Sequence, residues 1–162
     1  MAYNALDVID KVINTAEKIK KMYNDIIMDT KKNSPTYILL NVLIKNIDTN
    51  IQCYKSLSLE VGNLNGEEID FLIYDKISFL INEFNQKIFI YKDISIKTLF
   101  QSSLDIEKDL LALFIDIQGR LVRTKTDTNT NAYKILSKLI FQKETKIKDL
   151  ELFINGYLDS IS

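Results

Sequence analysis

The stretch that decides the fold is residues 95–123, SIKTLFQSSLDIEKDLLALFIDIQGRLVR. Positions three or four residues apart along it are Phe100, Leu104, Glu107, Leu111, Phe114, Ile117 and Leu121, and all but Glu107 are apolar. Side chains at this spacing lie on one face of an α-helix, because the helix turns once in about 3.6 residues. The sequence therefore predicts a long amphipathic helix over about residues 95–123, with its apolar face buried.

The rest of the chain repeats this pattern in four further segments. They span about residues 4–30, 35–59, 67–91 and 131–158, and short polar stretches separate them. Pro35 suits the first turn of the second segment, where a helix needs no backbone donor. Long helices joined by short connections favour antiparallel packing. We therefore predict an all-α fold with a single domain over residues 1–162: an antiparallel four-helix bundle with one additional helix, five helices in all.

The third predicted helix is apolar over a wider arc than the others. Phe71, Tyr74, Phe79 and Ile81 lie outside its main apolar stripe. A helix with such a wide arc is usually buried on two sides, by neighbouring helices or by a partner. Phe71, Tyr74 and Ile81 are therefore the candidate interface for a homodimer or for another protein.

Composition excludes several classes of function. The 162 residues include no histidine, which removes Ser–His and Cys–His nucleophile systems. With 21 Lys and Arg against 22 Asp and Glu, the chain lacks the basic surplus of a nucleic-acid-binding protein. Cys53 is the single cysteine, so no disulfide forms within the chain. No signal peptide is evident and the longest uncharged stretch is too short to cross a bilayer, so we expect a soluble cytoplasmic protein without membrane contact.

Four polar residues interrupt the apolar stripes and are the candidate site. Asn50 lies in the second segment, Glu107 in the fourth, and Lys143 and Lys146 in the fifth. One interpretation places them at the stripe edges, where long side chains reach water. The other is a polar cluster inside the bundle, with Glu107 paired to Lys143 or Lys146. A buried carboxylate without a partner costs several kcal/mol, so burial of Glu107 predicts such a pair.

Four segments resemble the metal-bearing helices of rubrerythrin-type ferritin-like proteins. Residues 104–114, LDIEKDLLALF, resemble a ligand helix of that family, in which a Glu precedes an aromatic residue by seven positions, as Glu107 precedes Phe114. Residues 132–151, AYKILSKLIFQKETKIKDLE, are similar to the partner helix, which normally carries Glu-x-x-His. Residues 15–23, TAEKIKKMY, and 43–54, LIKNIDTNIQCY, are similar to the first such pair. The resemblance implies a ferritin-like bundle whose third helix is the crossover between two hairpins.

The resemblance also implies that the di-metal centre has been lost. The ligand positions of the family fall on Ala16, Ile47, Asn50, Glu107, Lys143 and Lys146 in this sequence, and only Glu107 keeps a carboxylate. Two lysines would repel a metal cation, so we expect no metal and no cofactor. An ion pair between Glu107 and one of the lysines would then balance the interior charge. The expected function is non-enzymatic, in structure or protein interaction.

Two alternatives remain open from the residues. A metal-binding or redox protein could use carboxylates alone, and Glu17, Glu107 and Glu144 are the candidates. A small apolar or lipid-like ligand could bind between the helices. Two other acidic patterns have simpler explanations: residues 127–131 lack the glycine and the final acid of a calcium loop, and Glu67, Glu68 and Asp70 suit a helix N-terminus.

Overall fold

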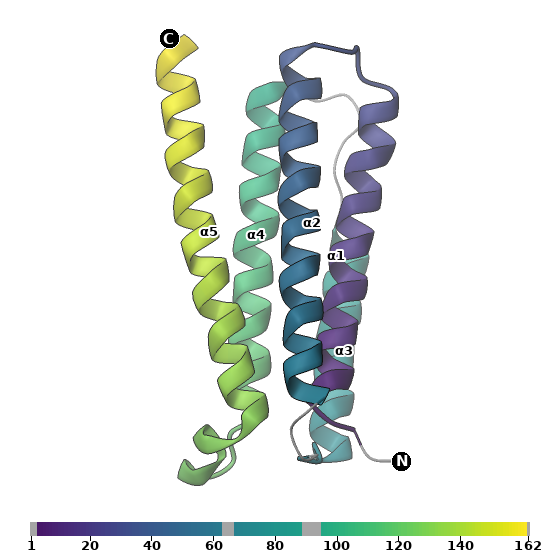
Figure 1. Cartoon of the computed structure of the whole chain (residues 1–162), viewed down its shortest axis with the longest axis vertical. Coiled ribbons are helices and arrows are strands. Elements are labelled where there is room, and N and C mark those ends of the chain that lie inside the picture. The colour runs from purple at the N-terminus through teal and green to yellow at the C-terminus, as the bar shows by residue number, and fades with distance from the viewer. Residues whose placement is uncertain (1–2, 63–66, 89–94, 162) are drawn as a thin grey trace.

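The computed structural model of the chain describes residues 3–62, 67–88 and 95–161. It contains five α-helices, which are α1 (Ala5–Met28), α2 (Pro35–Gly62), α3 (Phe71–Lys87), α4 (Ile96–Arg120) and α5 (Asn131–Ile161), and a 3₁₀ turn η1 (Lys125–Asn129). The predicted all-α fold with five helices is confirmed. Successive helices run in opposite directions along the long axis of the molecule (Figure 1).

The helices begin where their capping residues predict. At α1 the Asn4 side chain accepts hydrogen bonds from the backbone N–H groups of Leu6 and Asp7, and the Asp7 carboxylate accepts one from Asn4. The Ser95 hydroxyl accepts from the N–H of Thr98 and caps α4. Pro35 is the first residue of α2, as expected.

The helix α3 is shorter than the predicted segment over residues 67–91. It begins at Phe71, because Asp70 is its N-cap and the preceding Ile69 donates its N–H to the carbonyl of Tyr3 at 2.6 Å. This pairing with the start of the chain holds Ile69 in an extended conformation. α3 ends at Lys87, and residues 89–91 of the prediction lie outside the described residues.

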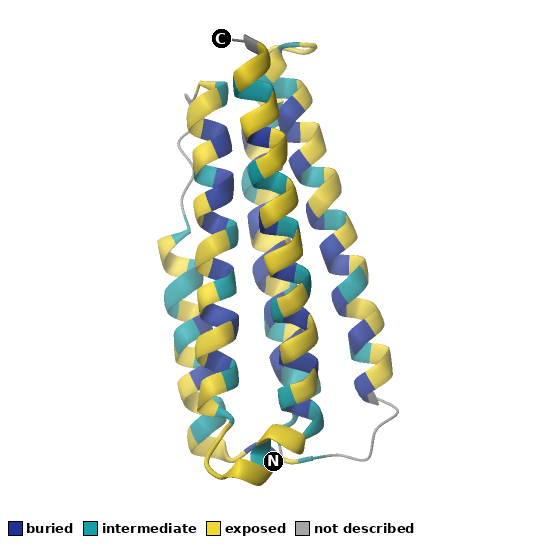
Figure 2. Ribbon diagram, turned by 90° about the vertical axis from the view of Figure 1, so that its left-hand side faces the viewer, coloured by how far each residue is buried: buried dark blue, intermediate teal, exposed yellow. Residues whose placement is uncertain are grey.

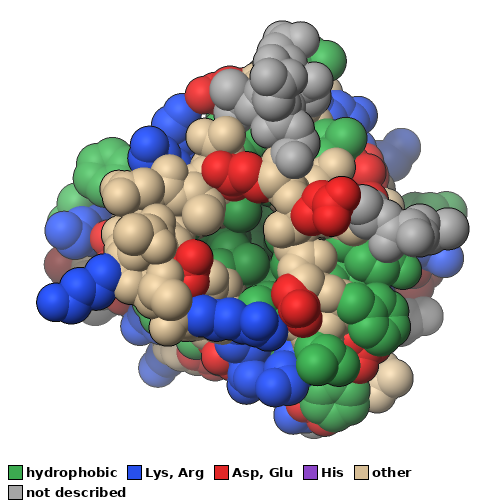
Figure 3. Space-filling model, turned by 90° about the horizontal axis from the view of Figure 1, so that it is seen from below, with side chains coloured by type: hydrophobic (Ala, Val, Ile, Leu, Met, Phe, Trp, Pro, Cys, Tyr) green, Lys and Arg blue, Asp and Glu red, His purple; other side chains and the backbone are tan. Residues whose placement is uncertain are grey.

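Glu67, just before α3, stabilises a different helix from the one that the sequence suggested. Its carboxylate accepts hydrogen bonds from the backbone N–H of Asn131, at 2.7 and 2.9 Å, and from that of Ala132 at 3.3 Å. Those N–H groups are the unsatisfied donors at the start of α5. At this lower end of the molecule, acidic side chains surround a hydrophobic hollow (Figure 3).

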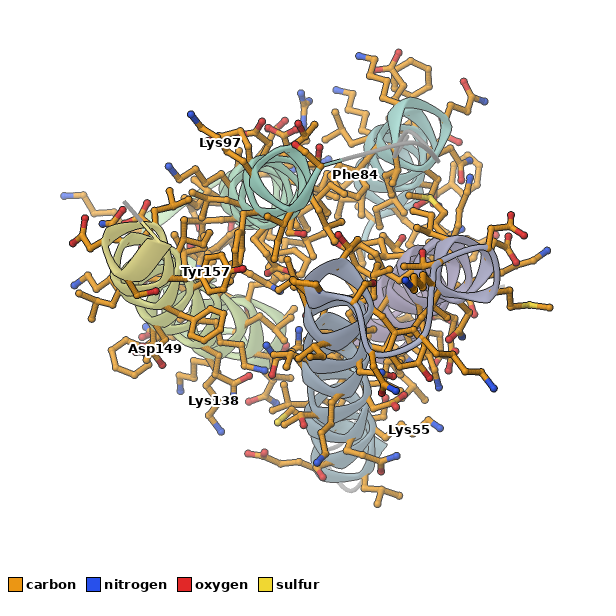
Figure 4. The ribbon with its side chains drawn as sticks, turned by 90° about the horizontal axis from the view of Figure 1, so that it is seen from above. Lys55, Phe84, Lys97, Lys138, Asp149 and Tyr157 are labelled. Atoms are coloured by element: carbon orange, nitrogen blue, oxygen red, sulfur yellow. The ribbon has the colours of Figure 1, made fainter. Side chains whose placement is uncertain are left out.

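The helices pack side by side around one apolar core. α1 packs along α2, α4 packs along α5, and α3 contacts both α1 and α4. Viewed down the long axis, the order of the helices around the bundle is α5, α4, α3, α1 and α2 (Figure 4). Phe84 of α3 lies on the side of that helix towards α4. Buried residues recur along each helix on its inner side, and exposed residues recur on the outer side (Figure 2). Among described residues, no helix has the length and apolar content needed to cross a bilayer.

The predicted interface on α3 is wrong at one of its three residues. Ile81 is only 2% exposed and belongs to the core, because it lies where α3 packs against the neighbouring helices α1 and α4. Tyr74 is partly buried and stacks on the ring of Tyr3, with 3.8 Å between ring centroids. Phe71 is 60% exposed, and therefore lies on the outer surface as predicted.

Candidate functional site

The candidate site is centred on an ion pair inside the bundle. The Nζ atom of Lys143 on α5 lies 2.7 Å from Oε2 of Glu107 on α4. The Lys143 side chain is 2% exposed and that of Glu107 is 19% exposed. Both residues interrupt the apolar stripes of their helices, and packing of α4 along α5 makes the two stripes face each other. The structure therefore places these two polar residues in the cluster rather than at the stripe edges.

The surroundings of Lys143 keep its side chain protonated. Burial lowers the pKa of the ammonium, but the nearby Glu107 carboxylate and the Tyr54 hydroxyl outweigh burial, and the net pKa is raised. Burial raises the pKa of Tyr54, the Lys143 charge partly offsets that rise, and the Glu107 charge adds to it. The charges of Lys143 on α5 and Glu107 on α4 thus influence each other and the neutral phenol of Tyr54 on α2.

A second polar contact links the two helical hairpins beside this pair. The hydroxyl of Tyr23 on α1 donates to Oγ of Ser103 on α4 at 3.2 Å, and Ser103 donates to the carbonyl of Leu99 at 2.7 Å. Burial raises the pKa of Tyr23, so its hydroxyl stays a donor. Ser103 was not among the predicted site residues. Its position next to Leu104 at the edge of the stripe was the available signal.

A cleft of about 370 Å³ opens between α2 and α5, and side chains of α1 and α4 also line it. Four of the predicted site residues lie on its wall: Ile47, Asn50, Glu107 and Lys146. The other two, Ala16 and Lys143, are buried in the bundle outside this lining. The structure thus gathers most of the predicted positions around one cleft.

Lys146 and Asn50 are the two wall residues whose polar groups are least satisfied. Lys146 is half-buried, and burial together with the positive charge of Lys143 lowers its pKa, although Cys53 and Glu107 act in the opposite direction. Within residues 3–62, 67–88 and 95–161 it makes no ion pair. Asn50 is 7% exposed, and its side chain forms no hydrogen bond with another described residue.

The donor atoms at this site do not fit a di-metal centre. The six ligand positions of the ferritin-like pattern supply a single carboxylate, and an ammonium group already binds it. Glu17 and Glu144, the other candidate carboxylates, are exposed. In the part of the chain that the structure describes, no three His, Cys, Asp or Glu side chains are grouped to hold a metal ion.

The Glu107 carboxylate neutralises the buried Lys143 ammonium, and the cleft beside this pair has a mostly apolar lining with Lys146 on its wall. Comparison of the chain with protein-family models, with curated proteins and with solved structures found no match. The likeness to ferritin-like proteins thus depends on the sequence segments alone.

Proposed function

We propose that this chain is a non-enzymatic, ferritin-like helical-bundle protein in which the Lys143–Glu107 ion pair takes the place of a di-metal centre. The observation that carries the proposal is the 2.7 Å contact of the two side chains at positions where the resembling family has metal ligands. In that family, a metal cation balances the buried carboxylates. Here an ammonium group of the chain itself balances the remaining carboxylate.

The replacements at the other ligand positions support the same proposal. Ala16 and Ile47 are 5% and 6% exposed and contribute apolar packing where charged ligands would need a cation. Lys146 adds a second positive charge beside Lys143. A metal cation in this region would be repelled by the ammonium groups of Lys143 and Lys146, and the Glu107 carboxylate is already paired with Lys143.

Elemental analysis tests the loss of the metal centre. The protein would be purified without chelators from medium supplied with iron and manganese, and metal would be measured per chain. We expect far less than one equivalent. The Lys143→Glu variant, analysed in the same way, shows whether the scaffold takes up metal when the lysine is exchanged for a carboxylate. Stoichiometric iron or manganese in the unaltered protein would overturn the proposal in favour of a carboxylate-only metal protein.

The role of the bundle is proposed to be association with a second copy of the chain through the outer face of α3. Phe71, Leu72 and Phe79 are 60%, 64% and 61% exposed there, and Asp75 and Lys76 are exposed between them. In a two-fold symmetric contact the same face serves both copies, and the opposite charges of Asp75 and Lys76 can pair across it. The cytoplasm remains the proposed compartment, because its reducing conditions suit the lone Cys53.

A further inference from the structure

The cleft between α2 and α5 has an apolar wall on each helix. Leu39, Leu43 and Ile47 line it from α2, and Leu150 and Phe153 line it from α5. Its volume of about 370 Å³ lies within the range of small-molecule sites in proteins, roughly 300–1,000 Å³. Between two long helices, this wall suits an extended aliphatic chain better than a compact polar molecule.

The polar part of the cleft contains hydrogen-bond donors without acceptors. Asn50 lies on the cleft wall with 7% of the residue exposed and, among described residues, its side chain forms no hydrogen bond. Lys146, on the same wall, makes no ion pair within the described chain. Both groups can donate to an anionic oxygen.

The local charge balance favours an anion over a neutral group. Lys143 and Glu107 neutralise each other, which leaves the positive charge of Lys146 on the wall. Asp149 also lines the cleft, but it is exposed and forms no ion pair with Lys146. A ligand carboxylate would stabilise the half-buried Lys146 ammonium, which burial and Lys143 otherwise disfavour.

We propose that this cleft binds a single-chain aliphatic carboxylate, with the carboxylate at Lys146 and Asn50 and the chain between α2 and α5. The chain would contact Leu43, Ile47 and Leu150. Neither self-association nor the absence of a metal depends on a ligand in this cleft. A failure of carboxylate binding would therefore leave the proposed function standing, and a failure of the proposed function would leave carboxylate binding standing.

Titration calorimetry with octanoate, decanoate and dodecanoate, each below its micelle concentration, tests the apolar wall. Each added methylene that enters the cleft should tighten binding about fourfold, until the chain outgrows the wall. Decan-1-ol and decylamine have the same chain with an uncharged or a cationic head. We expect decanoate to bind at least about tenfold more tightly than either, because only the carboxylate pairs with Lys146.

Two variants locate the site, and a third is the matched control. Lys146→Met keeps most of the side-chain length and removes the charge, so decanoate should lose about tenfold or more in affinity while decan-1-ol is unchanged. Val42→Trp fills the cleft from α2 and should weaken decanoate and decan-1-ol alike. Lys148→Met removes an exposed lysine from the same helix and should leave decanoate binding unchanged. Thermal unfolding followed by circular dichroism checks that each variant folds.

Three results would overturn the proposal. The first is the absence of saturable decanoate binding to the folded protein. The second is binding that ignores the head group, with decan-1-ol or decylamine as tight as decanoate. The third is an equal loss of decanoate affinity in Lys146→Met and Lys148→Met, which would indicate general attraction of an anion to surface lysines.

Discussion

Lys143 keeps a positive charge in a part of the bundle where only 2% of its side chain meets water. An isolated ammonium group there would lose its proton or destabilise the fold. The Glu107 carboxylate prevents both, because the two charges share a short hydrogen bond. The pair contributes little net stability, but removing either partner is costly, because the remaining charge is then buried without a counter-charge.

Glu107→Gln should therefore lower the free energy of unfolding by about 2–4 kcal/mol, because it leaves the Lys143 ammonium buried without a counter-charge. Urea unfolding measures the change. Glu151→Gln is the matched control, since Glu151 pairs with Lys108 between the same two helices in an exposed position, and its loss should cost at most about 1 kcal/mol. Equal effects of the two substitutions would show that Glu107 is no more than a surface partner.

The raised pKa of Tyr54 predicts how the free energy of unfolding changes at high pH. Burial raises its pKa above the ordinary value of 10.0, so the folded protein keeps a proton that the unfolded chain releases. Stability should fall as the pH rises past 10.0, and the raised pKa of Lys143 acts in the same direction above 10.5. The lowered pKa of Lys146 has the opposite effect: as the pH rises towards 10.5, this residue makes stability increase.

Tyr54→Phe should consequently flatten the alkaline decline in unfolding free energy, measured by urea titration at a series of pH values. Tyr37→Phe, on the less buried start of α2, serves as the control. In the unaltered protein, tyrosinate absorbance should show Tyr23, Tyr54 and Tyr74 ionising above pH 10.0, because burial raises the pKa of each. Ionisation of Tyr23 and Tyr54 at the pH of a free tyrosine would contradict this effect of burial.

The N-terminus of α5 is capped both by the preceding Thr130, whose hydroxyl accepts from the N–H of Tyr133, and by a distant part of the chain. The Glu67 carboxylate binds the N–H groups of Asn131 and Ala132, and its negative charge suits the positive end of the helix. Glu67→Ala should cost about 1 kcal/mol and speed amide exchange in the first turn of α5. Glu68→Ala changes the exposed neighbouring residue and should do neither. Unchanged exchange at Asn131 in the first variant would show that water replaces the cap.

The helices could largely be predicted because their apolar spacing is local information. The start of α3 could not, because its boundary depends on Ile69 pairing with Tyr3, more than sixty residues earlier. The 3₁₀ turn at Lys125–Asn129 was missed for another reason. Its side chains are polar throughout, and hydrogen bonds to the Asp127 carboxylate from the N–H groups of Arg123 and Thr124 help to fix it.

On the scale of the whole molecule, the candidate site could be predicted only in part. Polar residues on facing stripes indicated a Glu107–lysine pair, but Lys143 and Lys146 share one helix face, so spacing could not choose between them. The choice depends on how deeply each residue of α5 sits against α2 and α4. The cleft was beyond prediction for the same reason, because it forms where α2 and α5 line one space without packing closely against each other.

Self-association also belongs to this scale. Light scattering after size-exclusion chromatography should give a mass that rises with concentration towards twice 18.8 kDa. Phe79→Lys should abolish the rise, because it replaces a large apolar side chain of the exposed face of α3 with a charged one. Phe141→Lys, at a phenylalanine of α5 that is 70% exposed, should not. A single monomeric mass at high micromolar concentration would contradict the proposed contact.

The sequence separation of the contacts has a consequence for how the chain folds. Glu107 and Lys143 are 36 residues apart within the α4–α5 hairpin, whereas Tyr23 and Ser103, which join the two hairpins, are 80 residues apart. Closing the shorter loop loses less chain entropy, so the hairpin and its salt link form first. We therefore expect Lys143 to be paired with Glu107 before the two hairpins dock, so that no unpaired ammonium group has to be buried during folding.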